Sequence, residues 1–294
     1  MKYYLALLFL IIGYCSFGQN FQTDLTQYFR TGDTLKQRET LEKWKKENPN
    51  NPELYFNYFN YYLDMAKREI AAFIESQSQK SEMDEITQES EAKENQYAIN
   101  YENYTLNALE KIEEGINLYP DRLDMRLGKI YAFSQNGNWD EYTNEILKAI
   151  RQSNVNNNLW IWTNNEELSG GKNFFLSTLR TYQSTLFKMK EDDLLFNVRS
   201  IANEILKYYP TNTESLSDIS LTYILTNDYD SGIDFLLAAE KINPKNAEVL
   251  TNIAHTYSLK GEKAEAIKYY KKAMKLVDKV TVTSIKEEIE RLEK

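Results

Sequence analysis

The fold is decided by residues 216–273, which read LSDISLTYILTNDYDSGIDFLLAAEKINPKNAEVLTNIAHTYSLKGEKAEAIKYYKKA. When the sequence is aligned with itself at an offset of 34 residues, similar residues coincide. The matched pairs are Leu216 with Leu250, Ile219 with Ile253, Ser220 with Ala254, Tyr223 with Tyr257, Gly232 with Ala266, Leu236 with Tyr270, Ala239 with Ala273, and Pro210 with Pro244. A fixed period of about 20–50 residues is typical of chains built from stacked small units.

Each matched position has a physical role in a helical hairpin. Leu216, Ile219 and Tyr223 are spaced i, i+3, i+7, which puts them on one face of a first helix. The small residues of the pairs allow a second, antiparallel helix to approach closely. Pro244 ends that second helix, and Gly261 lies in the turn between the two helices, where the backbone bends sharply.

These residues resemble the tetratricopeptide repeat (TPR) family. The match is strict over residues 213–280 and looser elsewhere: Asp278 replaces the closing proline, and Asp124 stands where an upstream copy needs a large apolar residue. The resemblance implies an all-α, right-handed superhelical solenoid of antiparallel helix hairpins with a C-terminal capping helix. Ser284 and Glu287 have the spacing of a capping box and predict the start of that last helix.

The rest of the chain can be divided on the same pattern. Pro120 and Pro210 are 90 residues apart, which is 22 more than two repeats of 34 require, so the array is interrupted once. The predicted segments are 1–18 (signal peptide), 19–75 (degenerate helical hairpins), 76–95 (polar acidic linker or helix tip), 96–151 (degenerate hairpins), 152–172 (insertion containing Asn and Trp), 173–210 (degenerate hairpin), 213–246 and 247–280 (repeats), and 281–294 (capping helix).

The N-terminus has the layout of a secretory signal peptide. A basic start precedes an apolar run too short to span a bilayer, and small residues precede a cleavage site before Gln19. This predicts export to the periplasm or the exterior. Cys15 offers a second interpretation, lipid attachment, but the bulky Tyr14 stands where a small residue is expected before a lipidated cysteine. The composition otherwise predicts no transmembrane helix.

Candidate binding residues follow from the resemblance, because the first helix of each TPR hairpin lines a concave groove that holds partner peptides. The positions implied are Glu214, Ser217, Leu221, Ile224, Glu248, Thr251, Asn252, His255 and Leu259. Asn252 and His255 carry groups that could hydrogen-bond an extended peptide backbone. Ser217 and Leu221 stand where chaperone-type repeats place the Lys and Asn that grip a C-terminal carboxylate, so that mode is not expected. The alternative is that all of these residues are simply solvated.

A second candidate is a basic stripe on another predicted first helix. Arg122, Arg126 and Lys129 are spaced i, i+4, i+7. They could dock an acidic partner, or they could pair with carboxylates of this acidic chain.

The third candidate is the insertion, which carries Trp160 and Trp162. Exposed tryptophans anchor proteins or sugars, which gives the alternative function of a carbohydrate-handling surface protein. The other interpretation is that the two rings fill the break in the array.

The composition argues against catalysis and against several partners. His255 is the single histidine and Cys15 the single cysteine, so His-triad and Cys-containing metal sites are not expected. No nucleophile-elbow or phosphate-loop motif is present; a hydrolase using scattered carboxylates is a distant alternative. With 35 basic and 44 acidic residues, the net charge of −9 disfavours nucleic acid. The sequence predicts a scaffold for a protein or peptide, with no enzyme activity and no cofactor, and it does not specify the oligomeric state.

Overall fold

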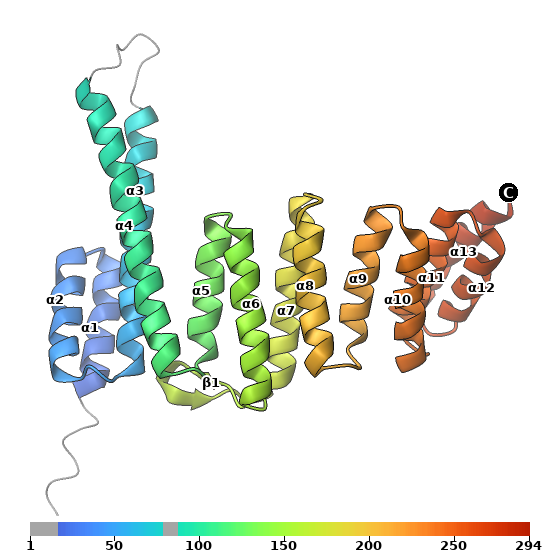
Figure 1. Cartoon of the computed structure of the whole chain (residues 1–294), viewed down its shortest axis with the longest axis horizontal. Helices are drawn as coiled ribbons and strands as arrows, with labels where there is room; N and C mark the ends of the chain where they lie inside the picture. The colour runs from blue at the N-terminus through green and yellow to red at the C-terminus, as the bar shows by residue number, and fades with distance from the viewer. Residues whose placement is uncertain (1–16, 79–87) are drawn as a thin grey trace, which may run out of the picture. The chain divides into compact units, whose positions relative to one another are not determined.

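The computed structural model describes residues 17–78 and 88–294, with side chains from 21–78 and 92–294. The described chain is built from helical hairpins, which confirms the predicted all-α helical-repeat class (Figure 1). It divides into two compact units. The first unit comprises Met1–Ala132 and Trp160–Leu168, and the second comprises Phe133–Leu159 and Ser169–Lys294. The predicted signal peptide lies almost wholly outside the described residues.

The first unit contains five helices and one short hairpin among its described residues. They are α1 (Phe17–Thr31), α2 (Thr34–Glu47), α3 (Pro52–Ser78), α4 (Gln88–Leu118), most of α5 (Leu123–Gln135), β1 (Ile161–Trp162), η1 (Thr163–Asn165) and β2 (Glu166–Glu167). Within this unit α3 and α4 pack along each other and extend beyond α1 and α2 (Figure 1). The segment 76–95, predicted as a linker or helix tip, contains the end of α3 and the start of α4, and 79–87 lie outside the described residues.

Two apolar clusters hold the first unit together. In one, Phe21 of α1 stacks on Trp44 of α2 with ring centroids 5.6 Å apart, and Tyr58 of α3 packs against them. In the other, Ile112 of α4 packs with Met125 of α5, and both are fully buried. The aromatic run from Tyr55 to Tyr62 therefore contributes buried rings to the core, among them Tyr58, Phe59 and Tyr61.

The second unit runs from the end of α5 through eight further helices. They are α6 (Trp139–Val155), α7 (Gly171–Met189), α8 (Leu194–Tyr208), α9 (Thr213–Leu225), α10 (Tyr229–Ile242), α11 (Ala247–Lys260), α12 (Lys263–Ala273) and α13 (Lys279–Glu293). Asn or Asp side chains accept backbone N–H hydrogen bonds at the N-termini of α6, α9, α10, α11 and α13. Such caps satisfy amide groups that a helix leaves without partners, which is why the helices begin where they do.

The turns and small residues behave as the 34-residue period predicts. Gly261 has φ = 86° in the turn after α11, and Asn227 has φ = 62° at the equivalent turn after α9. Glycine, and less often asparagine, adopts this left-handed conformation. A Cβ added to Gly232 would lie 2.9 Å from Cγ1 of Ile224. Ala254 is fully buried, so close helix approach does depend on small residues.

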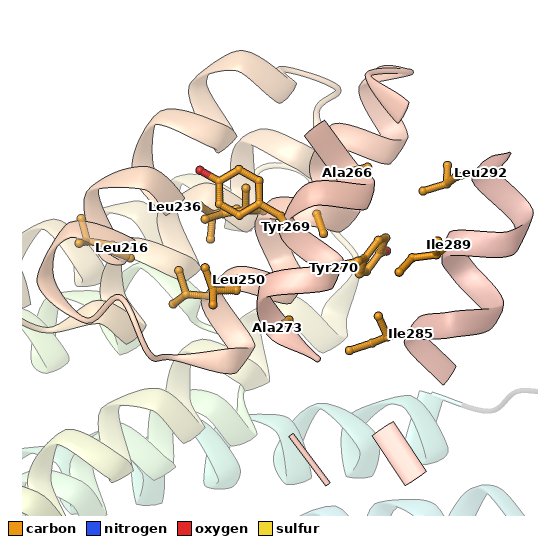
Figure 2. Close-up of a cluster of buried hydrophobic side chains, with 14 residues drawn as sticks. Leu216, Leu236, Leu250, Ala266, Tyr269, Tyr270, Ala273, Ile285, Ile289 and Leu292 are labelled. Atoms are coloured by element: carbon orange, nitrogen blue, oxygen red, sulfur yellow. The ribbon is translucent and has the colours of Figure 1, made fainter. Parts of the chain in front are cut away.

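The start of the capping helix was predicted wrongly. α13 begins at Lys279, ahead of the proposed capping box at Ser284, because the Asp278 side chain accepts the Thr281 N–H at 2.9 Å. Figure 2 shows Ile285, Ile289 and Leu292 of this helix directed toward Tyr270 of α12. α13 therefore covers apolar surface of the hairpin formed by α11 and α12.

Candidate functional site

A groove of about 730 Å³ lies in the second unit, and most of its lining comes from three helices, α7, α9 and α11. Each of them is the first helix of a hairpin. The family resemblance placed nine residues in a groove, and eight of them are found in the lining of this groove. They are Glu214, Ser217, Leu221, Ile224, Glu248, Asn252, His255 and Leu259. The ninth, Thr251, is not in the lining, and its hydroxyl donates to the carbonyl of Ala247 at 2.8 Å.

The lining residues follow a regular spacing along two helices. In α9 they include Glu214, Asp218, Leu221 and Leu225, and in α11 Glu248, Asn252, His255 and Leu259. Both sets are spaced i, i+4, i+7, i+11, which keeps them on one helix face. The groove is therefore acidic near the N-terminal ends of α9 and α11 and apolar near their C-terminal ends.

An arginine missed by the sequence analysis lies at the acidic end. Arg180 of α7 donates from Nη1 to Oε1 of Glu214 at 3.1 Å and from Nη2 to Oε1 of Glu248 at 3.0 Å. Position 180 precedes Glu214 by 34 residues, and Glu214 precedes Glu248 by the same interval. Extending the repeat register into α7 would have found Arg180.

Asp218 is the most perturbed acid of the groove. Burial raises the pKa of Asp218 to about 7; the nearby Arg180 guanidinium lowers it in part, and the charges of Glu214 and Glu248 raise it further. Desolvation disfavours the charged form of a carboxyl, and like charges act in the same direction. Asp218 therefore changes charge near neutral pH.

The Asp218→Asn variant is expected to be more stable than the wild type at alkaline pH. Because the folded pKa lies above the unfolded value of 3.8, the folded state holds more protons between pH 4 and 7. The free energy of unfolding contributed by Asp218 therefore falls as the pH rises through this range. We expect the variant to gain about 1–3 kcal/mol at pH 8.5 and almost nothing at pH 3.5. Urea denaturation across this pH range measures the difference.

The control for this experiment is Asp234→Asn, which removes an exposed carboxylate of α10. It should shift the free energy of unfolding by less than about 0.5 kcal/mol at every pH. A gain for Asp218→Asn that does not change with pH would contradict the assignment of the raised pKa.

The predicted basic stripe lies in the first unit and is committed to internal partners. Arg122 is 1% exposed and donates to Glu53 at 2.7 Å and to Asp124 at 2.7 Å. Lys129 donates to Glu113 at 2.6 Å, and Nε of Arg126 donates to the carbonyl of Pro120 at 2.9 Å.

The two interpretations of the stripe can therefore be separated. Arg122 and Lys129 pair with carboxylates of the chain, as one interpretation expects. The other interpretation needs an exposed surface for an acidic partner, and it fails because Arg122, Arg126 and Lys129 are all buried. The acidic Asp124, out of place in the repeat pattern, is explained as a partner of Arg122.

The insertion folds back onto the first unit. β1 and β2 pair antiparallel, with Ile161 opposite Glu167, and the Ile161 N–H donates to the carbonyl of Asp121 at 2.9 Å. Trp160 is 1% exposed, whereas Trp162 is partly exposed. Trp160 therefore fills space inside the protein and offers no face for a sugar to stack on.

The described residues contain neither a candidate membrane-spanning helix nor a candidate metal site. No helix within them is long and apolar enough to cross a bilayer. Across the same residues, no group of three or more His, Cys, Asp or Glu side chains is arranged to hold a metal ion.

Comparison with known proteins identifies the repeats. The tetratricopeptide repeat family model matches residues 213–246 and 247–276. No curated protein matches the chain. Among solved structures, the chain is similar to YrrB, described as a TPR protein with an unusual peptide-binding site, at 14% identity and a TM-score of 0.40, covering 84% of this chain and 97% of that one.

Two other solved structures have comparable scores. One is MamA, at 14% identity and a TM-score of 0.37, covering 61% of this chain and 92% of that one. The other is TTC0263, a thermophilic TPR protein in Thermus thermophilus, at 15% identity and a TM-score of 0.32, covering 93% and 97%. Residues 213–276 are two consecutive tetratricopeptide repeats, and their first helices form two of the three principal walls of the groove.

Proposed function

We propose that the protein is an exported binding scaffold and that the groove between α7, α9 and α11 holds a peptide segment of a protein partner. The observation that carries the proposal is a groove whose lining is acidic near the N-terminal ends of α9 and α11 and apolar near their C-terminal ends. Binding sites are typically concave, largely apolar and equipped with a few polar groups that fix orientation. TPR proteins as a class bind proteins or peptides, which agrees with this surface.

Asn252 and His255 are suited to bind the peptide backbone. Both line the groove on α11, one turn apart, and His255 is exposed. A side-chain amide both donates and accepts hydrogen bonds, as an extended backbone does. Leu221 and Leu259, both more than a third exposed, also line the groove and provide apolar surface for the side chains of the peptide.

The Asn252→Ala/His255→Ala double variant is expected to weaken peptide binding by roughly tenfold, because each lost hydrogen bond contributes about 0.5–1.5 kcal/mol. The probe is a random library of 12-residue peptides selected on the full chain. Fluorescence anisotropy with the best-binding sequences measures the dissociation constants.

The matched control is Lys241→Ala/Lys271→Ala, which truncates two exposed side chains on the second helices α10 and α12. It should leave the affinity unchanged. Equal affinities for the wild type and the groove variant would place the peptide elsewhere and refute this binding site.

Export rests on the predicted signal peptide at residues 1–18. Sequencing the N-terminus of the protein recovered from outside the cytoplasm tests it, since cleavage at the proposed position leaves Gln19 first. A mature chain that begins with an acylated Cys15 would replace secretion by lipid anchoring, and an intact Met1 would remove the export proposal.

A further inference from the structure

We propose that the partner presents a lysine or arginine side chain to the carboxylates of Glu214, Asp218 and Glu248, with bulky apolar residues beside it. This inference rests on the proposed function, because it names the chemistry of the peptide that the same groove would hold. It differs from recognition of an acidic C-terminus, which needs cations in the groove.

The charges of the groove are unbalanced. The carboxyl groups of Glu214, Asp218 and Glu248 lie around the single guanidinium of Arg180, which leaves a formal excess of two negative charges when Asp218 is ionised and of one when it is protonated. Arg180 donates to one oxygen of Glu214 and to one of Glu248. Among the described residues, nothing donates to their second oxygens or to the Asp218 carboxylate. The groove therefore has acceptor capacity for another cation.

The stability of the helices explains why two of these positions are acidic, but it does not explain the third. Glu214 and Glu248 lie in the first turns of α9 and α11, where a negative charge is favoured by the helix dipole. Asp218 lies one turn further along, and its raised pKa shows that its charged form is disfavoured there. A cation from a partner would relieve this desolvation and repulsion.

The ion pairs already present can rearrange. The Arg180 side chain is 49% exposed, and those of Glu214 and Glu248 are 44% and 61% exposed. Exposed pairs of this kind contribute about 0–1 kcal/mol. An incoming basic side chain can therefore share or take over these carboxylates at little cost.

The apolar end of the groove fits the rest of such a partner. Leu221, Leu225 and Leu259 are 39%, 53% and 45% exposed. The methylene stem of lysine or arginine packs on apolar surface while its charged end reaches polar groups. An acidic peptide or a nucleic acid would instead meet repulsion from the three carboxylates.

The experiment uses an array of acetylated, amidated octapeptides in which Leu stands on both sides of position 4. Position 4 is lysine, arginine, norleucine or glutamate, and binding of the full chain to each peptide is measured. The salt concentration is about 0.15 M, so that long-range attraction is screened. The expected result is binding roughly tenfold tighter with lysine or arginine than with norleucine, and weakest with glutamate.

Three variants assign the effect to these residues. Glu214→Gln/Glu248→Gln should abolish the preference for lysine over norleucine. Glu287→Gln/Glu290→Gln, which makes the same charge change on the exposed face of α13, should retain it. Arg180→Gln should tighten binding of the lysine peptide about two- to fivefold and leave the norleucine peptide unchanged, an improvement that a purely structural arginine would not give.

The outcomes separate this inference from the proposed function. If norleucine or glutamate peptides bind as well as lysine peptides, and Asn252→Ala/His255→Ala weakens them all, the groove binds peptides and the basic partner is wrong. If the two Glu→Gln pairs reduce the preference equally, the effect is general charge and the inference is also wrong. If neither the octapeptides nor the selected 12-residue peptides bind, both proposals fail.

Discussion

Replacing Arg122 with alanine is expected to lower the free energy of unfolding of the first unit by about 3–5 kcal/mol. The guanidinium is 1% exposed and forms hydrogen bonds with both oxygens of Glu53 and both of Asp124. Burial lowers the pKa of Arg122, but the hydrogen bonds to Asp124 and Glu53 more than offset this effect, so the group stays charged. Its removal would leave two carboxylates buried without their cation.

The same network attaches the insertion. Thr163 donates to Asp124 at 3.0 Å, and the N–H of Asn164 donates to Glu53 at 2.8 Å. The loss in Arg122→Ala should therefore include loosening of β1 and β2, which hydrogen–deuterium exchange would show as faster exchange at residues 160–168. Exchange that is unchanged there would mean that the insertion is held independently of the network.

Tryptophan fluorescence can follow the first unit alone. Of the four tryptophans, Trp44, Trp160 and Trp162 belong to this unit and Trp139 to the other. Urea titration in a Trp139→Phe background therefore reports on the first unit. Arg38→Ala, an exposed arginine of α2, is the control and should change stability by less than about 0.5 kcal/mol. A loss below about 1 kcal/mol for Arg122→Ala would contradict the buried-network argument.

Replacing Trp160 with alanine is expected to destabilise the first unit by about 3–5 kcal/mol. Trp160 is among the largest fully buried side chains in the described structure. Truncating such a ring removes its burial and leaves a cavity that the surroundings fill only in part. The same urea titration measures the effect, with Trp44 and Trp162 as the remaining probes.

Trp162→Ala is the matched control, because this ring is two residues away and only partly buried. It should cost less than half as much. The comparison also tests the carbohydrate alternative, in which both rings face solvent and similar small losses are expected. Quenching of Trp160 fluorescence by an oligosaccharide would contradict the buried position.

The groove residues show which parts of the candidate site could be predicted from the repeats and which could not. The lining residues on α9 and α11 were expected because the sequence resembles the TPR family, whose first helices line a groove, and the 34-residue period located the corresponding positions in this chain. Thr251 was expected in the lining and is not part of it, although Ser217, one period earlier, does line the groove. Arg180 was missed because α7 deviates too far from the repeat pattern to be assigned by its apolar residues.

By itself, the sequence determined the helical hairpins, their turns at Gly261 and Pro244, and the small residues where helices meet. These features depend on residues close together in the chain or separated by one period. Only the tertiary structure decided the partners of Arg122, because Glu53 is 69 residues away, and the burial of Trp160, because the insertion folds back onto Asp121. These two features depend on contacts between distant segments that do not follow the 34-residue period, so the period along the chain carries no information about them.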